Sequence, residues 1–193
     1  MTPRLVLFAR YPTAGSAKTR LIPALGPQRA ADVHRRLTER TIGVLRASEL
    51  PVELHYTGEE EQVFRLWLGN DLVMVEQVTG DLTYRLMAAL SPAPVIFFGA
   101  DTPDLDVHHV LAAVSALEQN EVVLGPAHDG GYYLIGMKRP IPELLTDMPW
   151  STDQVMPETL RRLDTLSIVP TILQTLHDCD RPSDLARWPW LTA

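Results

Sequence analysis

The sequence predicts an α/β fold whose sheet is mostly parallel and is covered by helices on both faces. Short apolar runs alternate with segments of helical period along the whole chain. Alternation of this kind requires crossover connections, which favour parallel strands buried between helices. No repeat, low-complexity tract or Gly/Ser-rich linker divides the 193 residues. We therefore expect residues 1–193 to form a single domain, with a split into two small domains as the alternative.

Strands are expected where apolar residues follow one another without a helical period. The first is the run from Arg4 to Phe8, and the most apolar is the run from Val95 to Gly99. The full set of expected strands is 4–8, 52–57, 72–76, 95–99, 121–124, 132–137 and 167–173.

Helices are expected where apolar residues recur every three or four positions. In the longest of them, Ala30, Val33, Leu37 and Val44 share one face, and Pro27 marks the first turn. The expected helices are 28–47, 59–68, 81–90, 106–119, 151–163 and a short closing helix at 182–188.

Composition excludes several classes of protein. The net charge is −7, which disfavours nonspecific binding to nucleic acid, although residues 1–50 hold nine Lys and Arg against three Asp and Glu. The single cysteine, Cys179, cannot form an internal disulfide, as is typical of the cytoplasm. No window approaches the roughly 20 apolar residues of a membrane helix. We expect a cytoplasmic protein with a small anionic ligand near its basic N-terminal quarter.

The first loop that follows a strand is the best candidate for the anion site. Ligands of such folds bind beyond the carboxyl ends of the strands. The segment from Ala9 to Leu21 is not a P-loop, because Pro12 and Ala17 stand where that motif has glycine, and no Gly-x-Gly-x-x-Gly follows the strand. It does carry Arg10, Lys18 and Arg20 among small residues. We favour an anion site over a merely solvated loop.

A candidate metal ligand follows the most apolar strand. Asp101 stands directly after that strand in Gly-Ala-Asp-Thr-Pro-Asp, and a carboxylate held there suits Mg²⁺ that bridges substrate phosphates. The competing interpretation is helix capping, which we assign to Asp104.

Two later segments carry further candidates. Asp129-Gly130-Gly131 is either a hairpin turn or a place where a substrate approaches the backbone, and an aromatic pair follows it. In Asp178-Cys179-Asp180 the two acids point to opposite sides if the chain is extended, so we expect only Asp180 to face the crevice. Cys179 is expected to be an inert buried thiol. The six histidines show no metal-binding spacing, and no Ser-His-Asp or Cys-His signature is present.

Several segments together resemble one known family over nearly the full length and in the same order. They are 9–21, 80–82, 99–105, 125–134, 150–152 and 178–185. The family is DUF2064, a glycosyltransferase-like group of the nucleotide-diphospho-sugar transferase superfamily. The resemblance implies a single-domain, three-layer α/β/α GT-A fold, Rossmann-like, with a mixed and mostly parallel sheet and a strand order near 3-2-1-4-6-5-7.

The resemblance also implies roles for individual residues. Asp101 and Asp180 match the pair that binds Mg²⁺ (or Mn²⁺), with Lys18, Arg20 and Asp101 as catalytic groups. The nucleotide-binding positions are Ala9, Arg10, Gly15, Lys18, Arg20, Gly80 and Asp81. The acceptor-binding positions are Asp129, Gly130, Gly131, Tyr132 and Trp150. The chain departs from the family pattern at Thr83 and Tyr84, where Gly and Glu are usual, and at Thr102, where Ser is usual.

The expected function is a Mg²⁺-dependent transferase that acts on a nucleotide-activated donor and an acceptor of unknown identity. Attack on the α-phosphate of a nucleoside triphosphate and attack on the anomeric carbon of a nucleotide sugar share this arrangement, and the sequence does not separate them. The alternative is a non-catalytic nucleotide-binding module on the same fold.

Overall fold

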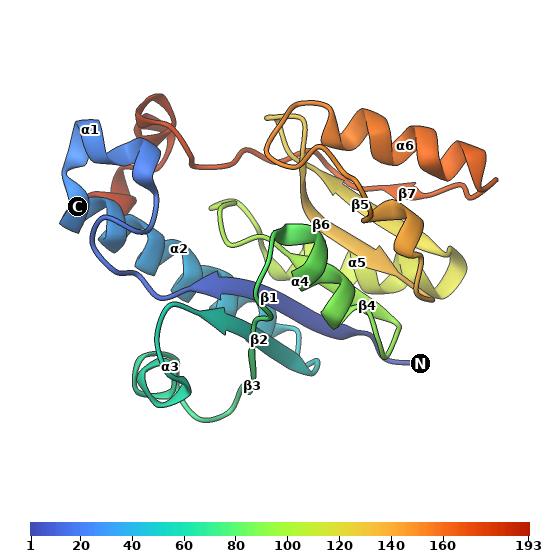
Figure 1. Ribbon diagram of the computed structural model, residues 1–193, viewed down its shortest axis with the longest axis horizontal. Helices are drawn as coiled ribbons and strands as arrows, with labels where there is room; N and C mark the ends of the chain where they lie inside the picture. Colours follow the sequence, from blue (N-terminus) through green and yellow to red (C-terminus); the bar gives the residue numbers. More distant parts are fainter.

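The computed structural model describes all 193 residues and contains one seven-stranded sheet (Figure 1). The strand order is β3-β2-β1-β4-β6-β5-β7, and only β6 runs antiparallel to its neighbours. This confirms the expected order and the mixed, mostly parallel sheet. The strands are β1 (Arg4–Arg10), β2 (Val52–Thr57), β3 (Val73–Glu76), β4 (Val95–Phe98), β5 (Val122–Pro126), β6 (Tyr132–Met137) and β7 (Thr171–Ile172).

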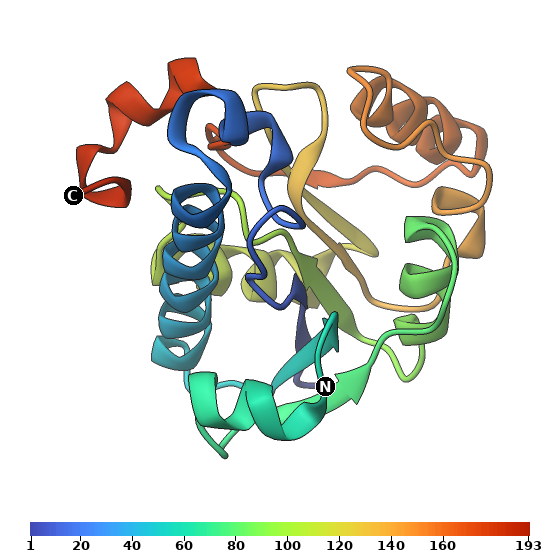
Figure 2. The ribbon, with the colours of Figure 1, turned by 60° about the vertical axis from the view of Figure 1, so that its left-hand side comes forward.

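Helices cover both faces of the sheet, which gives the three layers. Figure 2 shows α2 on one side and α4 and α6 on the other. The α-helices are α1 (Ile22–Leu25), α2 (Pro27–Ala47), α3 (Glu61–Leu68), α4 (Leu82–Ala89), α5 (Val107–Gln119) and α6 (Val155–Thr165). Four short 3₁₀ helices complete the chain: η1 (Thr19–Leu21), η2 (Pro142–Leu144), η3 (Pro182–Arg187) and η4 (Pro189–Leu191).

The two apolar cores follow from the alternation of side chains along the strands. On β1, Leu5 and Leu7 face one core, which α2, α3 and α5 cover. Val6 faces the other core, together with Phe97 of β4, beneath α4 and α6. Because both faces are buried, these strands read as continuous apolar runs in the sequence.

The C-terminal segment packs against the start of the chain. Leu21, Val33 and Leu37 form a third, smaller cluster with Trp188 and Leu191. Figure 1 shows the red C-terminal segment beside α1. The packing brings the first loop next to the segment that carries Asp180.

Some element boundaries differ from those expected. Helix α6 begins at Val155 rather than 151, because Ser151 lies in the left-handed region (φ 64°) and residues 151–154 form turns. Strand β7 is only Thr171–Ile172, and Pro170 directly before it has no N–H to contribute to the ladder. The closing helix at 182–188 is a 3₁₀ helix instead. No helix of the structure has the length and apolar character needed to cross a bilayer.

Candidate functional site

Three pockets lie together near the carboxyl ends of the central strands. We name the first, of about 350 Å³, the cationic pocket, because three basic side chains line it against two carboxylates. Its basic residues are Arg10, Lys18 and Arg20, and its acidic residues are Asp101 and Asp180. The remaining lining residues are Ser16, Ala17, Thr19 and His34.

The Lys18 ammonium group lies between the two predicted metal ligands. Its Nζ is 2.8 Å from Oδ1 of Asp101 and 2.8 Å from Oδ1 of Asp180. It also donates to the carbonyl oxygen of Cys179 at 2.7 Å. An ammonium has three N–H bonds, and each has an acceptor here. The two acids, far apart in the sequence, therefore meet around the ammonium group of Lys18, whereas the sequence predicts that they meet around a divalent metal ion.

Burial and charge act in opposite directions on Lys18. Burial alone would lower its pKa, since only 4% of the side chain is exposed. The attraction of Asp101 and Asp180 outweighs that burial and raises the pKa above its ordinary value. Asp180 shows the converse, because Lys18 and Arg20 outweigh its burial and lower its pKa. Both groups are therefore charged at neutral pH.

The backbone at Lys18 is strained. Its φ and ψ of 48° and 45° lie in the left-handed region, directly before η1. A residue other than glycine pays roughly 1 kcal/mol or more for this conformation, and such strain is concentrated at functional sites.

Two side chains besides Lys18, those of Arg20 and Asp184, hold the loop that carries Asp180. Oδ2 of Asp180 accepts a hydrogen bond from Arg20 at 2.6 Å. The Asp184 carboxylate accepts from the backbone N–H groups of Asp180 and Arg181 at the start of η3. Asp184 thus caps the start of the short helix, while Asp180 faces the site.

The donor set fits a divalent cation that a substrate helps to coordinate. Mg²⁺ is commonly bound by one or two carboxylates with phosphate oxygens and water. Asp101 and Asp180 converge on the Lys18 ammonium group, so a divalent cation would bind both carboxylates in exchange for contacts of Lys18. The Asp101 side chain is 45% exposed and lines the cationic pocket. No group of three or more His, Cys, Asp or Glu side chains is arranged to hold a metal without such help.

A second pocket, the polar pocket, adjoins the first and shares Arg20 and Asp180 with it. It measures about 410 Å³, and none of its eleven lining residues is hydrophobic. They are Arg20, His128, Asp129, Ser151, Thr152, Asp153, His177, Asp178, Asp180, Arg181 and Asp184.

The polar pocket contains Asp178, which the sequence predicts to face away from the crevice. Asp178 lines it together with Asp180, so the expectation that only Asp180 faces the crevice is wrong. The reason is that residues 177–180 are irregular, and the alternation of an extended strand does not apply. Asp178 accepts a hydrogen bond from Thr102 at 2.7 Å. Burial, with Asp129 and Asp101 nearby, raises its pKa to about 7.

Three histidines also lie at the site. The rings of His128 and His177 stack 3.6 Å apart in the polar pocket. Nε2 of His34 faces the carbonyl oxygen of Arg10 at 2.9 Å in the cationic pocket. No spacing in the sequence identifies them, because each comes from a different element.

A third pocket, the apolar pocket, shares Asp101 and His34 with the cationic pocket. It measures about 240 Å³, and 11 of its 14 lining residues are hydrophobic. Of the expected acceptor residues, Tyr132 and Trp150 line this pocket, whereas Asp129 lines the polar pocket. Three of the five residues are therefore divided between two pockets, and Gly130 and Gly131 line neither of them.

The glycines of the acceptor candidate have a visible structural role. Gly130 has a φ of 93°, and a Cβ there would lie 2.5 Å from Cα of Asp153. The N–H of Gly131 donates to Asp129 Oδ1 at 2.9 Å. These contacts shape the tight turn between β5 and β6.

Other expected nucleotide-binding residues lie around the site rather than in its pockets. Asp81 caps α4 by accepting from the N–H of Tyr84, and Gly80 precedes it with a φ of 126°. Ala9 is buried in β1, and Gly15 lies in the first loop with a φ of 84°. None of these four lines the cationic pocket.

The structure also tests two other expectations, the helix cap assigned to Asp104 and the buried thiol of Cys179. Asp106, not Asp104, caps α5, because its carboxylate accepts from the first-turn N–H groups, while Asp104 accepts from Nε1 of Trp188. Cys179 is fully buried, as expected, and burial raises the pKa of its thiol to about 11.

Comparison with known proteins agrees with this architecture. Residues 41–152 match the model of a family described as uncharacterized proteins conserved in bacteria, DUF2064, which is more than half of the chain. The chain belongs to this family. No curated protein matches the sequence.

Solved structures show the same fold. A candidate nucleotide-diphospho-sugar transferase from Desulfovibrio desulfuricans G20 is 26% identical with a TM-score of 0.87, over 94% of this chain and 84% of that one. The 4-diphosphocytidyl-2C-methyl-D-erythritol synthase of Anaerococcus prevotii DSM 20548 is 10% identical (TM-score 0.63, 99% and 95% covered). Rv0371c of Mycobacterium tuberculosis H37Rv, solved with manganese, is 17% identical (TM-score 0.55, 97% of each chain).

Proposed function

We propose that this protein is a divalent-metal-dependent transferase that binds a nucleotide-activated donor with its phosphates in the cationic pocket. The observation that carries the proposal is that Asp101 and Asp180 meet at the Lys18 ammonium group, which is 2.8 Å from each carboxylate. Arg10 and Arg20 line the same pocket. Acids and bases gathered around a buried lysine, at the carboxyl edge of a mostly parallel sheet, are typical of a site for a charged ligand.

The basic side chains have different tasks in this proposal. Arg10 and Arg20 are exposed at the pocket and can form charge-assisted hydrogen bonds with phosphate oxygens, Arg20 through the guanidinium N–H groups that do not bind Asp180. Lys18 keeps the two carboxylates together, and it reaches a phosphate only by exchanging one of its three bonds. Together they stabilise the negative charge that develops on the leaving phosphate.

Asp101 and Asp180 are the residues that would hold the metal. When bound, a divalent cation supplies charge neutralisation between the donor phosphates and this acidic pair. Rate enhancement then comes from positioning the donor and from electrostatics, without a covalent intermediate.

The structural neighbours support this class of function. One is a candidate nucleotide-diphospho-sugar transferase, another is a diphosphocytidyl-methylerythritol synthase, and a third was solved with manganese. Transfer of a nucleotidyl group and transfer of a sugar both fit the cationic pocket. The products distinguish them, since the first releases pyrophosphate and the second a nucleoside diphosphate.

A binding experiment with one variant and one control tests the proposal. Nucleoside triphosphates and nucleotide sugars are titrated by calorimetry with and without Mg²⁺. We expect Mg²⁺-dependent binding to weaken at least tenfold in Asp101→Asn, because one carboxylate ligand is lost. The exposed Asp164 of α6 is the control, and Asp164→Asn is expected to bind like the wild type.

Two results would contradict the proposal. Equal Mg²⁺-dependent affinity of Asp101→Asn and wild type would remove the metal assignment. Nucleotide binding with no Mg²⁺ dependence and no product detectable by ³¹P NMR would indicate the non-catalytic nucleotide-binding module instead.

A further inference from the structure

The apolar pocket lies beside the proposed reaction centre but differs from it in chemistry. Its walls are Phe8 of β1, Phe97 of β4, Leu82 and Leu86 of α4, and Trp150 from the segment before α6. Asp101 lies at its border with the cationic pocket. A group bound in the apolar pocket is therefore next to the proposed metal ligand.

Hydrogen bonds hold the two walls of this pocket together. Nε1 of Trp150 donates to Oγ1 of Thr83 at 2.8 Å, and the Thr83 hydroxyl donates to the carbonyl oxygen of Leu145 at 3.1 Å. Thr83 belongs to α4, so one hydroxyl connects this helix to the segment that carries Trp150. The Trp150 ring also meets Tyr132 edge to face, with centroids 6.2 Å apart.

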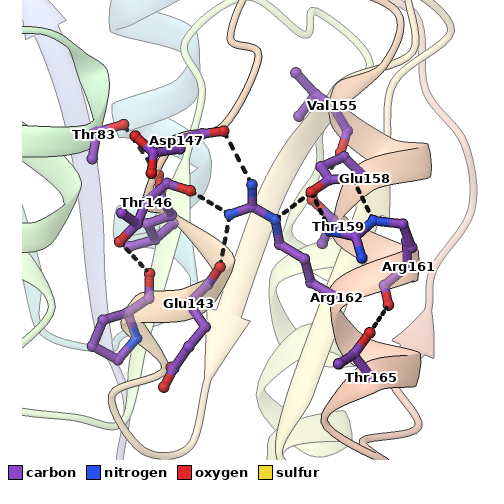
Figure 3. A network of polar contacts seen from close by, with 12 residues as sticks. Thr83, Glu143, Thr146, Asp147, Val155, Glu158, Thr159, Arg161, Arg162 and Thr165 are labelled. Carbon is purple, nitrogen blue, oxygen red and sulfur yellow. Dashed lines mark hydrogen bonds and ion pairs between the residues drawn. The ribbon is translucent and has the colours of Figure 1, made fainter.

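Arg162 of α6 anchors the same segment from behind. Figure 3 shows its guanidinium group between Glu158 and three backbone carbonyl groups. Those carbonyls belong to Glu143, Thr146 and Asp147. The wall that carries Trp150 is thus pre-organised, without a ligand to order it.

The aromatic walls of the pocket present few polar atoms to a ligand. The Trp150 indole N–H donates to Thr83. The Tyr132 hydroxyl has no hydrogen-bond partner, but it is buried toward Thr159 of α6. The polar side chains that line the apolar pocket are those of Asp101 and His34, which lie at its border with the cationic pocket. A nucleobase needs partners for the donors and acceptors on its edge, and these walls offer few. An apolar group needs none.

From these contacts we propose that the acceptor substrate carries an uncharged apolar group, about one ring in size, that binds between α4 and Trp150. The proposal rests on the proposed transferase function, since it assigns the group to the acceptor. The size follows from the volume of about 240 Å³, compared with roughly 150 Å³ for a cavity that holds benzene. Trp150 and Leu82 are then specificity-determining residues.

The test uses a simple apolar probe and does not require transfer activity. Benzyl alcohol is titrated into the ¹⁵N-labelled protein, and glycerol serves as the polar counterpart. The readout is the indole N–H signal of Trp150, assigned from the spectrum of Trp150→Phe. We expect a saturable shift with benzyl alcohol and none with glycerol.

Two variants and a control show where the probe binds. Leu82 is 38% exposed at the pocket, and Leu111 is 46% exposed on α5. Benzyl alcohol is expected to bind at least tenfold more weakly to Leu82→Asp and to Leu82→Trp, which fills the space without adding charge. Leu111→Asp is expected to bind like the wild type. Far-UV circular dichroism confirms that each variant is folded.

The possible failures are distinguishable. Absence of a saturable shift, an equal shift with glycerol, or undiminished binding to both Leu82 variants would overturn the apolar pocket as a ligand site. Binding of benzyl alcohol by a wild-type protein that binds no nucleotide would contradict the transferase, and with it the assignment of this group to an acceptor. If the nucleotide affinity of Leu82→Asp equals that of the wild type, the apolar pocket and the nucleotide site are separate subsites.

Discussion

At the scale of single residues, Lys18 explains how Asp101 and Asp180 can lie close together in the protein without a bound ligand. Two carboxylates held close together repel each other, and each carries a desolvation cost in a half-buried position. Lys18 places one charge between Asp101 and Asp180, and its third N–H bond satisfies a backbone carbonyl. The pair is therefore assembled in the folded protein, and the left-handed backbone at Lys18 is part of that arrangement.

His55 gives a prediction for the pH dependence of stability. It is buried on β2 with Glu53 at 3.3 Å, and the Phe8 ring packs against it. Burial is the largest influence and lowers the pKa of His55. The Arg4 charge acts in the same direction, and Glu53 acts in the opposite one. At acidic pH the folded state then binds fewer protons than the unfolded state. The contribution of neutral, buried His55 to the free energy of unfolding is therefore complete above about pH 6.5 and is lost as the pH falls below that value.

We therefore expect His55→Gln to flatten the fall in unfolding free energy between pH 6.5 and 5, by up to about 1.4 kcal/mol per pH unit. Urea unfolding at several pH values measures this slope. The exposed His108 is the control, and His108→Gln should keep the wild-type slope. A wild-type slope in His55→Gln would show that this ring does not titrate as its burial implies.

At the scale of elements, the sequence pattern located strands more accurately than turns. The bounds of β2 and β6 are as expected. Strand β2 alternates apolar and polar residues between Pro51 and Gly58, and β6 is a mostly apolar run between Gly131 and Lys138. Helix α6 starts four residues later than expected, because the left-handed backbone conformation of Ser151 is incompatible with a helix start there. Local residue types do not encode that turn, which depends on packing of Asp153 against Gly130.

The segment before α6 gives a second prediction. Arg162 is 15% exposed and binds three carbonyl oxygens besides Glu158, whereas Arg161 is 65% exposed and binds Glu158 alone. Lysine lacks the planar fork that makes several such bonds at once. We expect Arg162→Lys to lower the free energy of unfolding by about 1–3 kcal/mol, and Arg161→Lys by less than about 0.5 kcal/mol.

Urea unfolding of both arginine variants provides the comparison. The Trp150 indole N–H signal in the folded state should also shift in Arg162→Lys, since the anchored segment carries that ring. Equal stability of the two variants would mean that the carbonyl contacts of Arg162 contribute nothing measurable.

At the scale of the whole molecule, the site depends on the packing of the two ends of the chain. Trp188 is 6% exposed within the cluster that joins the C-terminal segment to α2, and its Nε1 donates to Asp104 at 2.8 Å. Trp190, two residues later, is 40% exposed. The Asp180 carboxylate reaches Lys18 only while this segment is docked.

We accordingly expect Trp188→Ala to reduce the free energy of unfolding by about 3–5 kcal/mol, as for other buried aromatic residues. Trp190→Ala should cost about 1 kcal/mol or less. Chemical denaturation followed by circular dichroism measures both. A small effect of Trp188→Ala would show that the C-terminal segment is not firmly docked and that Asp180 is not held at the site.

The sequence by itself determined the fold class and the strands, because hydrophobic periodicity is a local property that survives without tertiary contacts. It also identified Lys18, Arg20, Asp101 and Asp180 as charged residues in loops beyond the sheet or in the segment after it. Only the tertiary structure decided that the Lys18 ammonium lies between the two acids, that Asp178 faces the site, and that Asp129 lines a different pocket from Tyr132 and Trp150. These features depend on distances between residues far apart in the chain, which packing sets and spacing in the sequence does not encode.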